Sequence, residues 1–106
     1  MQRVCFLLRV KRDRLDEYKA AHKNVWPEMR EALSRHGWHN YSLFLADDGL
    51  LVGYVEVEDF GQSVAGMQAE EVNARWQAAM TDFFEPLTTG AADTSLVTLE
   101  QVFYLP

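Results

Sequence analysis

Apolar positions along the chain follow two periods, one typical of strands and one typical of helices. The stretch "RVCFLLRV", residues 3–10, places apolar side chains on both of its faces, which predicts a strand that is buried on both sides. "NYSLFLA" and "LLVGYVEV", residues 40–46 and 50–57, flank "DDG" and predict a β-hairpin, because Asp-Gly favours a tight turn. "LVTLEQVFYL", residues 96–105, predicts the last strand.

Steps of three and four predict helices between these strands. One helical face carries Leu15, Tyr18, His22, Val25, Met29 and Leu33. Proline disfavours helical geometry in the residue before it, so we expect a break near Asn24 to Trp26, with Pro27 in the first turn of a second segment. Residues 60–71 are predicted to be helical, and a clearer helix that stops near Pro86 follows. The apolar face of this last helix is formed by Val72, Trp76, Ala79, Met80, Phe83 and Leu87.

The order of these elements is β, α, β, β, α, β, the split βαβ pattern of ferredoxin-like folds. We therefore predict an α+β fold, one domain over residues 1–106, with a four-stranded antiparallel sheet and the helices on one face. The other face carries apolar side chains from the first and last strands. A second copy that covers about 800 Å² of it would make a standard interface, so we expect a homodimer with the two sheets face to face.

Charge and cysteine usage narrow the classes of partner. The 106 residues include 16 acidic and 10 basic side chains, and the net charge of -6 disfavours nucleic acid and membrane surfaces as partners. The single cysteine, Cys5, cannot form an intramolecular disulfide, and the apolar run around it is too short for a signal peptide or a membrane span. We therefore expect the protein in the cytoplasm, with a small molecule as its ligand.

Four amphipathic side chains are candidates for the binding site. Tyr18 and His22 lie one turn apart on the core-facing side of the first helix, and Trp76 lies on the apolar face of the last. One register of the second strand directs Tyr41 toward the same layer. Taken singly, each is more often a core residue. Together they favour a wet pocket for a polyhydroxylated ligand, because each buried polar group without a partner costs roughly 1 to 3 kcal/mol.

Other polar clusters give weaker signals. His36 and His39 are three residues apart, but Gly37 lies between them and no third ligand is close in the sequence, so we expect no metal site. Glu70 and Glu71 are typical of a solvated helix face.

Several short motifs resemble those of the L-rhamnose mutarotase family. They are Tyr18-x-x-x-His22, "WPE" at 26–28, "HGWHNY" at 36–41, Trp76, "MTD" at 80–82 and the terminal "VFYLP". The resemblance implies a dimeric α/β barrel of ferredoxin-like domains that interconverts the α and β anomers of L-rhamnose, or acts on a related deoxysugar, without cofactor. It also implies His22 as the proton donor and Tyr18, Tyr41 and Trp76 as sugar-binding residues. Where many members have a second tryptophan after Trp76, this chain has Gln77, which puts the sugar preference in question.

Three questions stay open at the level of the sequence. The catalytic base is Tyr18, a carboxylate or a bound water. A cofactor-free or haem-assisted oxygenase of the dimeric α/β barrel superfold is an alternative function, because that architecture hosts unrelated chemistries. A non-catalytic dimer that binds a small ligand, with His22 as a plain core residue, is another.

Overall fold

The computed structural model describes residues 1–85 and 97–106. Along the chain, its strands and α-helices are β1 (Gln2–Val10), α1 (Leu15–Lys23), α2 (Pro27–Arg35), β2 (His39–Leu45), β3 (Leu50–Val57), α3 (Phe60–Gln68), α4 (Glu71–Met80), β4 (Phe84–Glu85) and β5 (Val97–Leu99). Short 3-10 turns precede α1 and follow α4. The predicted order of strands and helices is therefore confirmed.

The sheet is antiparallel, in the order β2-β3-β1-β4. Strand β1 pairs along its whole length with β3, and its other edge is shared by β4 and β5. The prediction of one long last strand over 96–105 is wrong within the described residues, because β5 ends at Leu99; residue 96 lies outside them. Glu100 and Gln101 interrupt the apolar alternation at the point where the chain leaves the sheet. Two short strands thus occupy the place of the predicted fourth strand.

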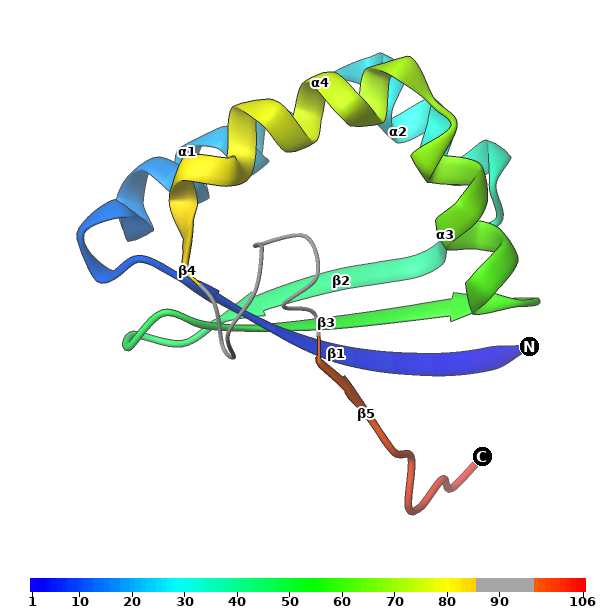
Figure 1. The fold of residues 1–106 in the computed structure, drawn as a ribbon. Coiled ribbons are helices and arrows are strands. Elements are labelled where there is room, and N and C mark those ends of the chain that lie inside the picture. Colours follow the sequence, from blue (N-terminus) through cyan, green and yellow to red (C-terminus); the bar gives the residue numbers. More distant parts are fainter. Residues whose placement is uncertain (86–96) are drawn as a thin grey trace.

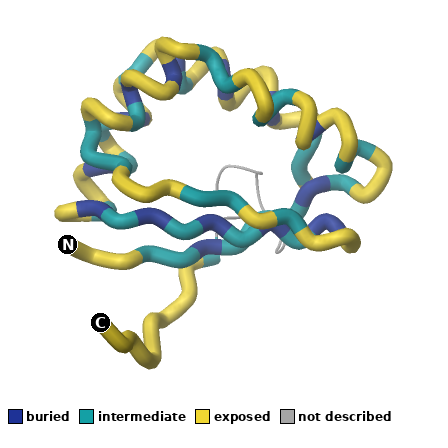
Figure 2. Tube along the Cα trace, turned by 180° about the vertical axis from the view of Figure 1, so that it is seen from behind, coloured by how far each residue is buried: buried dark blue, intermediate teal, exposed yellow. Residues whose placement is uncertain are grey.

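All of the described helices lie on one face of the sheet (Figure 1). Buried and less buried positions alternate along β3 (Figure 2). The buried set faces the helices, because Leu51 packs with Tyr18 of α1 and Val57 lies in a cluster that contacts Phe60 of α3. On this side Phe6 packs with Val55 and Val57. A side chain at Gly53 would overlap the ring of Phe6, so glycine is what allows β1 and β3 to carry that ring between them. This layer is the floor on which the helices rest.

The predicted break in the first helical region is present. Helix α1 ends at Lys23 and α2 begins at Pro27, with Trp26 in an extended conformation at φ -55° and ψ 135°. This is the geometry that proline imposes on the residue before it, and proline at the first helical position loses no hydrogen bond. The break turns Trp26 toward the last helix, where it packs against the cluster described next.

The main core cluster joins the second, third and fourth helices. It consists of Met29, Ala32, Met67, Val72, Trp76 and Met80. Three of these positions were predicted as one face of the last helix, which is confirmed for α4, whereas Ala79 of that predicted face is exposed. Pro86 and Leu87 lie outside the described residues. None of the described helices has the length and apolar character needed to cross a membrane.

The outer face of the sheet, which points away from the helices, is uncovered in the single chain. Phe44 keeps 62% of its surface exposed there. Cys5 and Leu7 of β1 stand opposite Tyr54 and Val52 of β3 on this face, and they are only half-buried. The apolar second face predicted from the first strand is therefore real.

Candidate active site

Tyr18 and His22 form the centre of the candidate site on α1. Tyr18 is buried and His22 is half-buried, so the imidazole is neither sealed in the core nor turned out to bulk solvent. The two ring centroids lie 4.2 Å apart. The i, i+4 spacing that marked them in the sequence is what stacks one ring on the other.

The backbone fixes which nitrogen of His22 carries a proton. Its Nδ1 lies 3.0 Å from the carbonyl oxygen of Tyr18. A carbonyl oxygen only accepts, so Nδ1–H is the donor and Nε2 of the neutral ring keeps its lone pair. Burial lowers the pKa of His22, and the hydrogen bond to the Tyr18 carbonyl opposes that effect in part. At neutral pH the neutral ring, with Nε2 ready to accept a proton, therefore predominates.

Trp76 of α4 contacts His22. Its ring meets that of His22 edge to face, with centroids 5.4 Å apart and planes at 84°. Trp26 meets Trp76 in the same manner at 5.1 Å and 88°. Trp76 thus stands beside the imidazole, and Trp26, the residue before α2, stands beside Trp76. Aromatic faces of this kind suit the apolar C–H side of a sugar ring.

Tyr41 enters from β2. Its ring lies 5.0 Å from that of Trp38 and 6.2 Å from that of Phe6, so it faces the layer between helices and sheet, as predicted. The residue keeps 37% of its surface exposed, yet burial around the hydroxyl raises the pKa of Tyr41 to about 12. Burial also raises the pKa of Tyr18, and the nearby Tyr41 adds to that rise. The two phenols therefore lie near enough to influence each other, and both keep their protons at neutral pH.

The structure does not bring Gln77 together with the other four residues. Its side chain is exposed and its Nε2 donates to Oδ1 of Asn73, one turn earlier, over 3.3 Å. The next residue along a helix is rotated by about 100°, so a buried Trp76 leaves Gln77 pointing sideways. In the single chain Gln77 is a neighbour of the site rather than part of its wall.

Two aromatic residues of the site were not singled out from the sequence. Trp26 and Trp38 are both half-buried, and each contacts a predicted site residue. Trp38 also donates its indole N–H to the carbonyl oxygen of Ser63 over 3.3 Å. Trp26 belongs to the motif "WPE" and Trp38 to the motif "HGWHNY". Pro27 was a local signal that Trp26 lies outside the helix.

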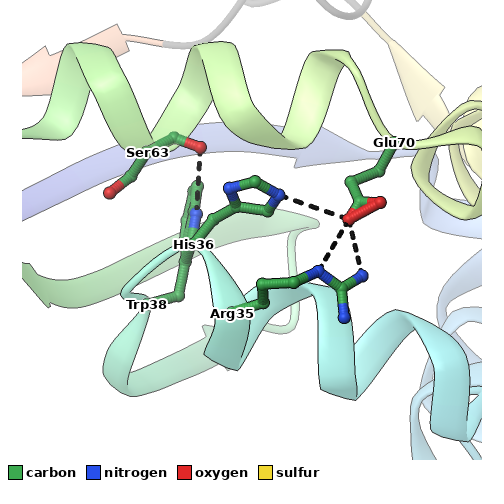
Figure 3. A network of polar contacts seen from close by, with 5 residues as sticks. All are labelled: Arg35, His36, Trp38, Ser63 and Glu70. Carbon is green, nitrogen blue, oxygen red and sulfur yellow. Dashed lines mark hydrogen bonds and ion pairs between the residues drawn. The ribbon is translucent and has the colours of Figure 1, made fainter.

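His36, which the sequence analysis considered as a metal ligand, pairs with a carboxylate instead. The Nε2 of His36 lies 3.2 Å from a carboxylate oxygen of Glu70, which also accepts two hydrogen bonds from Arg35 at 2.6 and 3.2 Å (Figure 3). The prediction that Glu70 lies on a solvated helix face is therefore wrong. Glu70 is half-buried and links the end of α2 to the start of α4. His39 is exposed on β2.

The chemistry that this arrangement offers is proton transfer. In the part of the chain that the structure describes, no three His, Cys, Asp or Glu side chains converge as a metal site would require. What converges is one imidazole whose Nε2 has no hydrogen-bond partner among the described residues, two phenol groups that can donate hydrogen bonds, and flat indole rings. This set suits a ligand that carries both hydroxyl groups and an apolar face.

Known proteins are similar to this chain over nearly its whole length. The family model of L-rhamnose mutarotase matches residues 3–105. An L-rhamnose mutarotase of Bacillus subtilis (strain 168) is 41% identical over 108 residues, with 99% of each chain covered. That of Pectobacterium carotovorum subsp. carotovorum (strain PC1) is 42% identical at the same coverage.

Solved structures agree on the fold. The crystal structure of an L-rhamnose mutarotase from Formosa agariphila superimposes with a TM-score of 0.81 over all of both chains, at 22% identity. A protein of Nitrosomonas europaea assigned as an antibiotic biosynthesis monooxygenase gives 0.60 at 16% identity, covering 92% of this chain and 84% of that one. Both of these likenesses concern the fold alone, whereas the family match and the identities to the curated relatives span nearly the whole chain. The chain belongs to the L-rhamnose mutarotase family.

Proposed function

We propose that the protein interconverts the α and β anomers of L-rhamnose by opening and closing the sugar ring, without a cofactor. The observation that carries the proposal is the half-buried His22 beside Trp76: its Nδ1 is held by the Tyr18 carbonyl, and its Nε2 has no hydrogen-bond partner within residues 1–85 and 97–106. The full-length identity to relatives named L-rhamnose mutarotase supports the choice of sugar.

Ring opening requires two proton movements at neighbouring oxygens. The anomeric hydroxyl loses a proton and the ring oxygen gains one, which gives the open aldehyde; rotation about the bond to the carbonyl carbon and closure on its other face then give the second anomer. Both oxygens are bonded to the same carbon, so one nitrogen atom can reach both. In this scheme Nε2 of His22 takes the proton from the hydroxyl and delivers it, as imidazolium, to the ring oxygen. The resemblance to the family implies that His22 is the proton donor. In this scheme that role is the second step, in which the imidazolium gives its proton to the ring oxygen.

The environment of Tyr18 argues against it as the catalytic base. Burial raises the pKa of Tyr18, and the proximity of Tyr41 raises it further, so the phenolate is scarce at neutral pH. We assign Tyr18 and Tyr41 the role of hydrogen-bond donors to sugar oxygens. Positioned acid-base groups typically accelerate such steps by about 10² to 10⁴.

The indole of Trp76, next to Trp26, gives the sugar a flat apolar surface. The C–H side of a pyranose and the methyl group of a 6-deoxysugar both fit such a surface better than a hydroxymethyl group does. We keep Gln77 as a position that modulates sugar preference from the flank of Trp76.

Saturation-transfer NMR of L-rhamnose tests the proposal directly. Wild type should exchange the two anomeric signals well above the buffer rate, and His22→Gln should lose at least about 100-fold of that exchange. The glutamine amide can still donate to the Tyr18 carbonyl, so the variant keeps the local fold while it lacks a nitrogen that accepts and releases a proton. Exchange at the wild-type rate in the variant would remove His22 from the mechanism.

We also propose that the protein works as a homodimer in the cytoplasm, with the outer faces of two sheets in contact. The exposed Phe44 and the half-buried Leu7 and Val52 support the choice of face. Sedimentation velocity tests the dimer independently of activity. No observation at the site favours the oxygenase alternative over proton transfer.

A further inference from the structure

Strand β2 carries a bulge at the point where Tyr41 enters the candidate site. The regular pairing of β2 with β3 breaks between His39 and Ser42. Two residues of β2, Asn40 and Tyr41, there stand opposite one residue of β3, Val55. An extra residue of this kind bends the strand and changes the direction of a side chain, and such bulges are frequent next to active sites.

Asn40 supplies the backbone conformation of the bulge. Its φ of 49° lies in the left-handed region, and in the described part of the chain it is the one residue other than glycine with a positive φ. Asparagine tolerates this region better than most residues, whereas a β-branched residue there is strained. Conformations of this kind gather at functional sites, where the surrounding structure maintains them.

The side chain of Asn40 is held on the outer face of the sheet. Its Nδ2 donates to Oε1 of Glu56 over 3.3 Å, and the other carboxylate oxygen of Glu56 accepts a hydrogen bond from the Tyr54 hydroxyl over 3.0 Å. Glu56 and Tyr54 belong to the less buried set of β3, which faces away from the helices. The bulge is thus fixed from the side opposite the site.

Tyr41 points to the helix side of the sheet. Its ring lies between that of Trp38, at 5.0 Å, and that of Phe6, at 6.2 Å. Trp38 is held in turn by its hydrogen bond to the carbonyl oxygen of Ser63 (Figure 3). These contacts limit how the ring turns, whereas the point from which it starts is set by the backbone at Asn40.

We propose that Asn40 is a positioning residue of the candidate site: its left-handed backbone and its bond to Glu56 direct the Tyr41 hydroxyl toward the sugar. This role rests on the function proposed above, in which Tyr41 donates to a sugar oxygen. A side chain that is already in place loses less conformational entropy when the sugar binds. Asn40 therefore acts on sugar binding through Tyr41 and leaves the proton transfer at His22 unchanged.

A double-mutant cycle, read by saturation transfer at a series of L-rhamnose concentrations, tests this coupling. Asn40→Val disfavours the left-handed backbone and should raise KM roughly 5- to 10-fold at unchanged kcat, as the loss of one hydrogen bond would. Tyr41→Phe should do the same, and Asn40→Val should then add less than about twofold to it. Asn40→Gly adopts a positive φ without strain and should stay within about threefold of wild type. Two effects that multiply in full would overturn the proposal.

His39→Val is the matched control, because it puts the same residue at the exposed, paired position just before the bulge. It should leave KM and kcat unchanged, and a KM as high as that of Asn40→Val would overturn the role of Asn40. Asn40→Ala also disfavours a positive φ and should raise KM in the same direction, which keeps the test available if the valine variant does not fold.

The ionisation of Tyr41 supplies a readout that needs no sugar. The protein is labelled with ¹³C at the tyrosine Cζ atoms, and Tyr41→Phe identifies the signal. Burial raises the pKa of Tyr41 to about 12, so in wild type and Asn40→Gly the phenol should stay protonated up to about pH 11. In Asn40→Val it should ionise near the ordinary value of about 10, because the ring loses its buried place. A wild type without anomer exchange would make the proposed function wrong, and a Tyr41 that titrates alike in all variants would overturn the positioning role.

Discussion

The Nδ1 atom of His22 lies 3.0 Å from the carbonyl oxygen of Tyr18, so the backbone of α1 itself holds the imidazole of the candidate site. A carbonyl oxygen has two lone pairs, so that of Tyr18 can accept Nδ1–H of His22 in addition to a backbone N–H of the helix. The break before Pro27 shapes the site in another way, because it turns Trp26 toward Trp76.

The first prediction concerns the pH dependence of anomer exchange. Burial lowers the pKa of His22 below its ordinary value of about 6.5, and the neutral ring is the form that accepts the first proton. The catalysed rate should be flat above about pH 6.5 and should fall as the pH decreases, with a midpoint below 6.5. Saturation transfer at a series of pH values, with the buffer rate subtracted, measures it. A rate that rises toward acid would show that the imidazolium is the form that starts the reaction.

The same group makes stability depend on pH. As the pH falls through about 6.5 the unfolded chain binds a proton at His22 before the folded chain does, so protonation favours unfolding. The contribution of His22 is therefore complete above that pH and is lost below it. In urea unfolding between pH 8 and 5, wild type should lose more stability than His22→Gln. Parallel curves for the two proteins would show that the imidazole titrates alike in both states.

The sequence predicted those parts of the site that depend on helix periodicity. Tyr18 and His22 share a face because they are four residues apart, and Trp76 lies on the buried stripe of α4. Tyr41 was less certain, because its direction depends on strand register. The pairing of β2 with β3 shifts between His39 and Ser42, and Asn40 adopts a positive φ of 49° there. No local pattern announces such an irregularity.

Other features depend on packing that no short stretch of sequence encodes. The partial burial of His22 involves its contact with Trp76, which lies in another helix far along the chain. The anchoring of Glu70 needs Arg35 and His36, which are some 35 residues away in the chain. The early end of β5, by contrast, has a local counterpart, because Glu100 and Gln101 interrupt the apolar alternation directly after Leu99.

The position next to Trp76 provides a test of sugar preference. Gln77→Trp places a second indole on α4, where the glutamine side chain now donates to Asn73. We expect altered affinity or preference among L-rhamnose and other deoxysugars, with the midpoint of the pH profile unchanged because His22 keeps its surroundings. Asn73→Ala is the control, since it removes the same hydrogen bond without adding a ring. An acid shift of the profile, or loss of the fold, would show Gln77 to be a structural position instead.

The last prediction compares two glycines of α3 that should respond in opposite directions. A side chain at Gly66 would overlap the ring of His36, whereas one at Gly61 meets nothing closer than Asp59 Oδ1 at 3.4 Å. Gly61→Ala should therefore stabilise the protein by about 0.4 to 1 kcal/mol, as alanine does at a compatible helical position.

Gly66→Ala gains the same helix propensity but must displace His36 from Glu70, and crowding of this kind typically costs about 1 to 3 kcal/mol. Urea unfolding of both variants at pH 7 measures the difference. Anomer exchange should stay at the wild-type rate in both, because His36 makes no contact with the rings around His22. Equal stability changes in the two variants would show that the His36 ring moves aside without cost, and that the contact between α2 and α3 does not depend on a glycine.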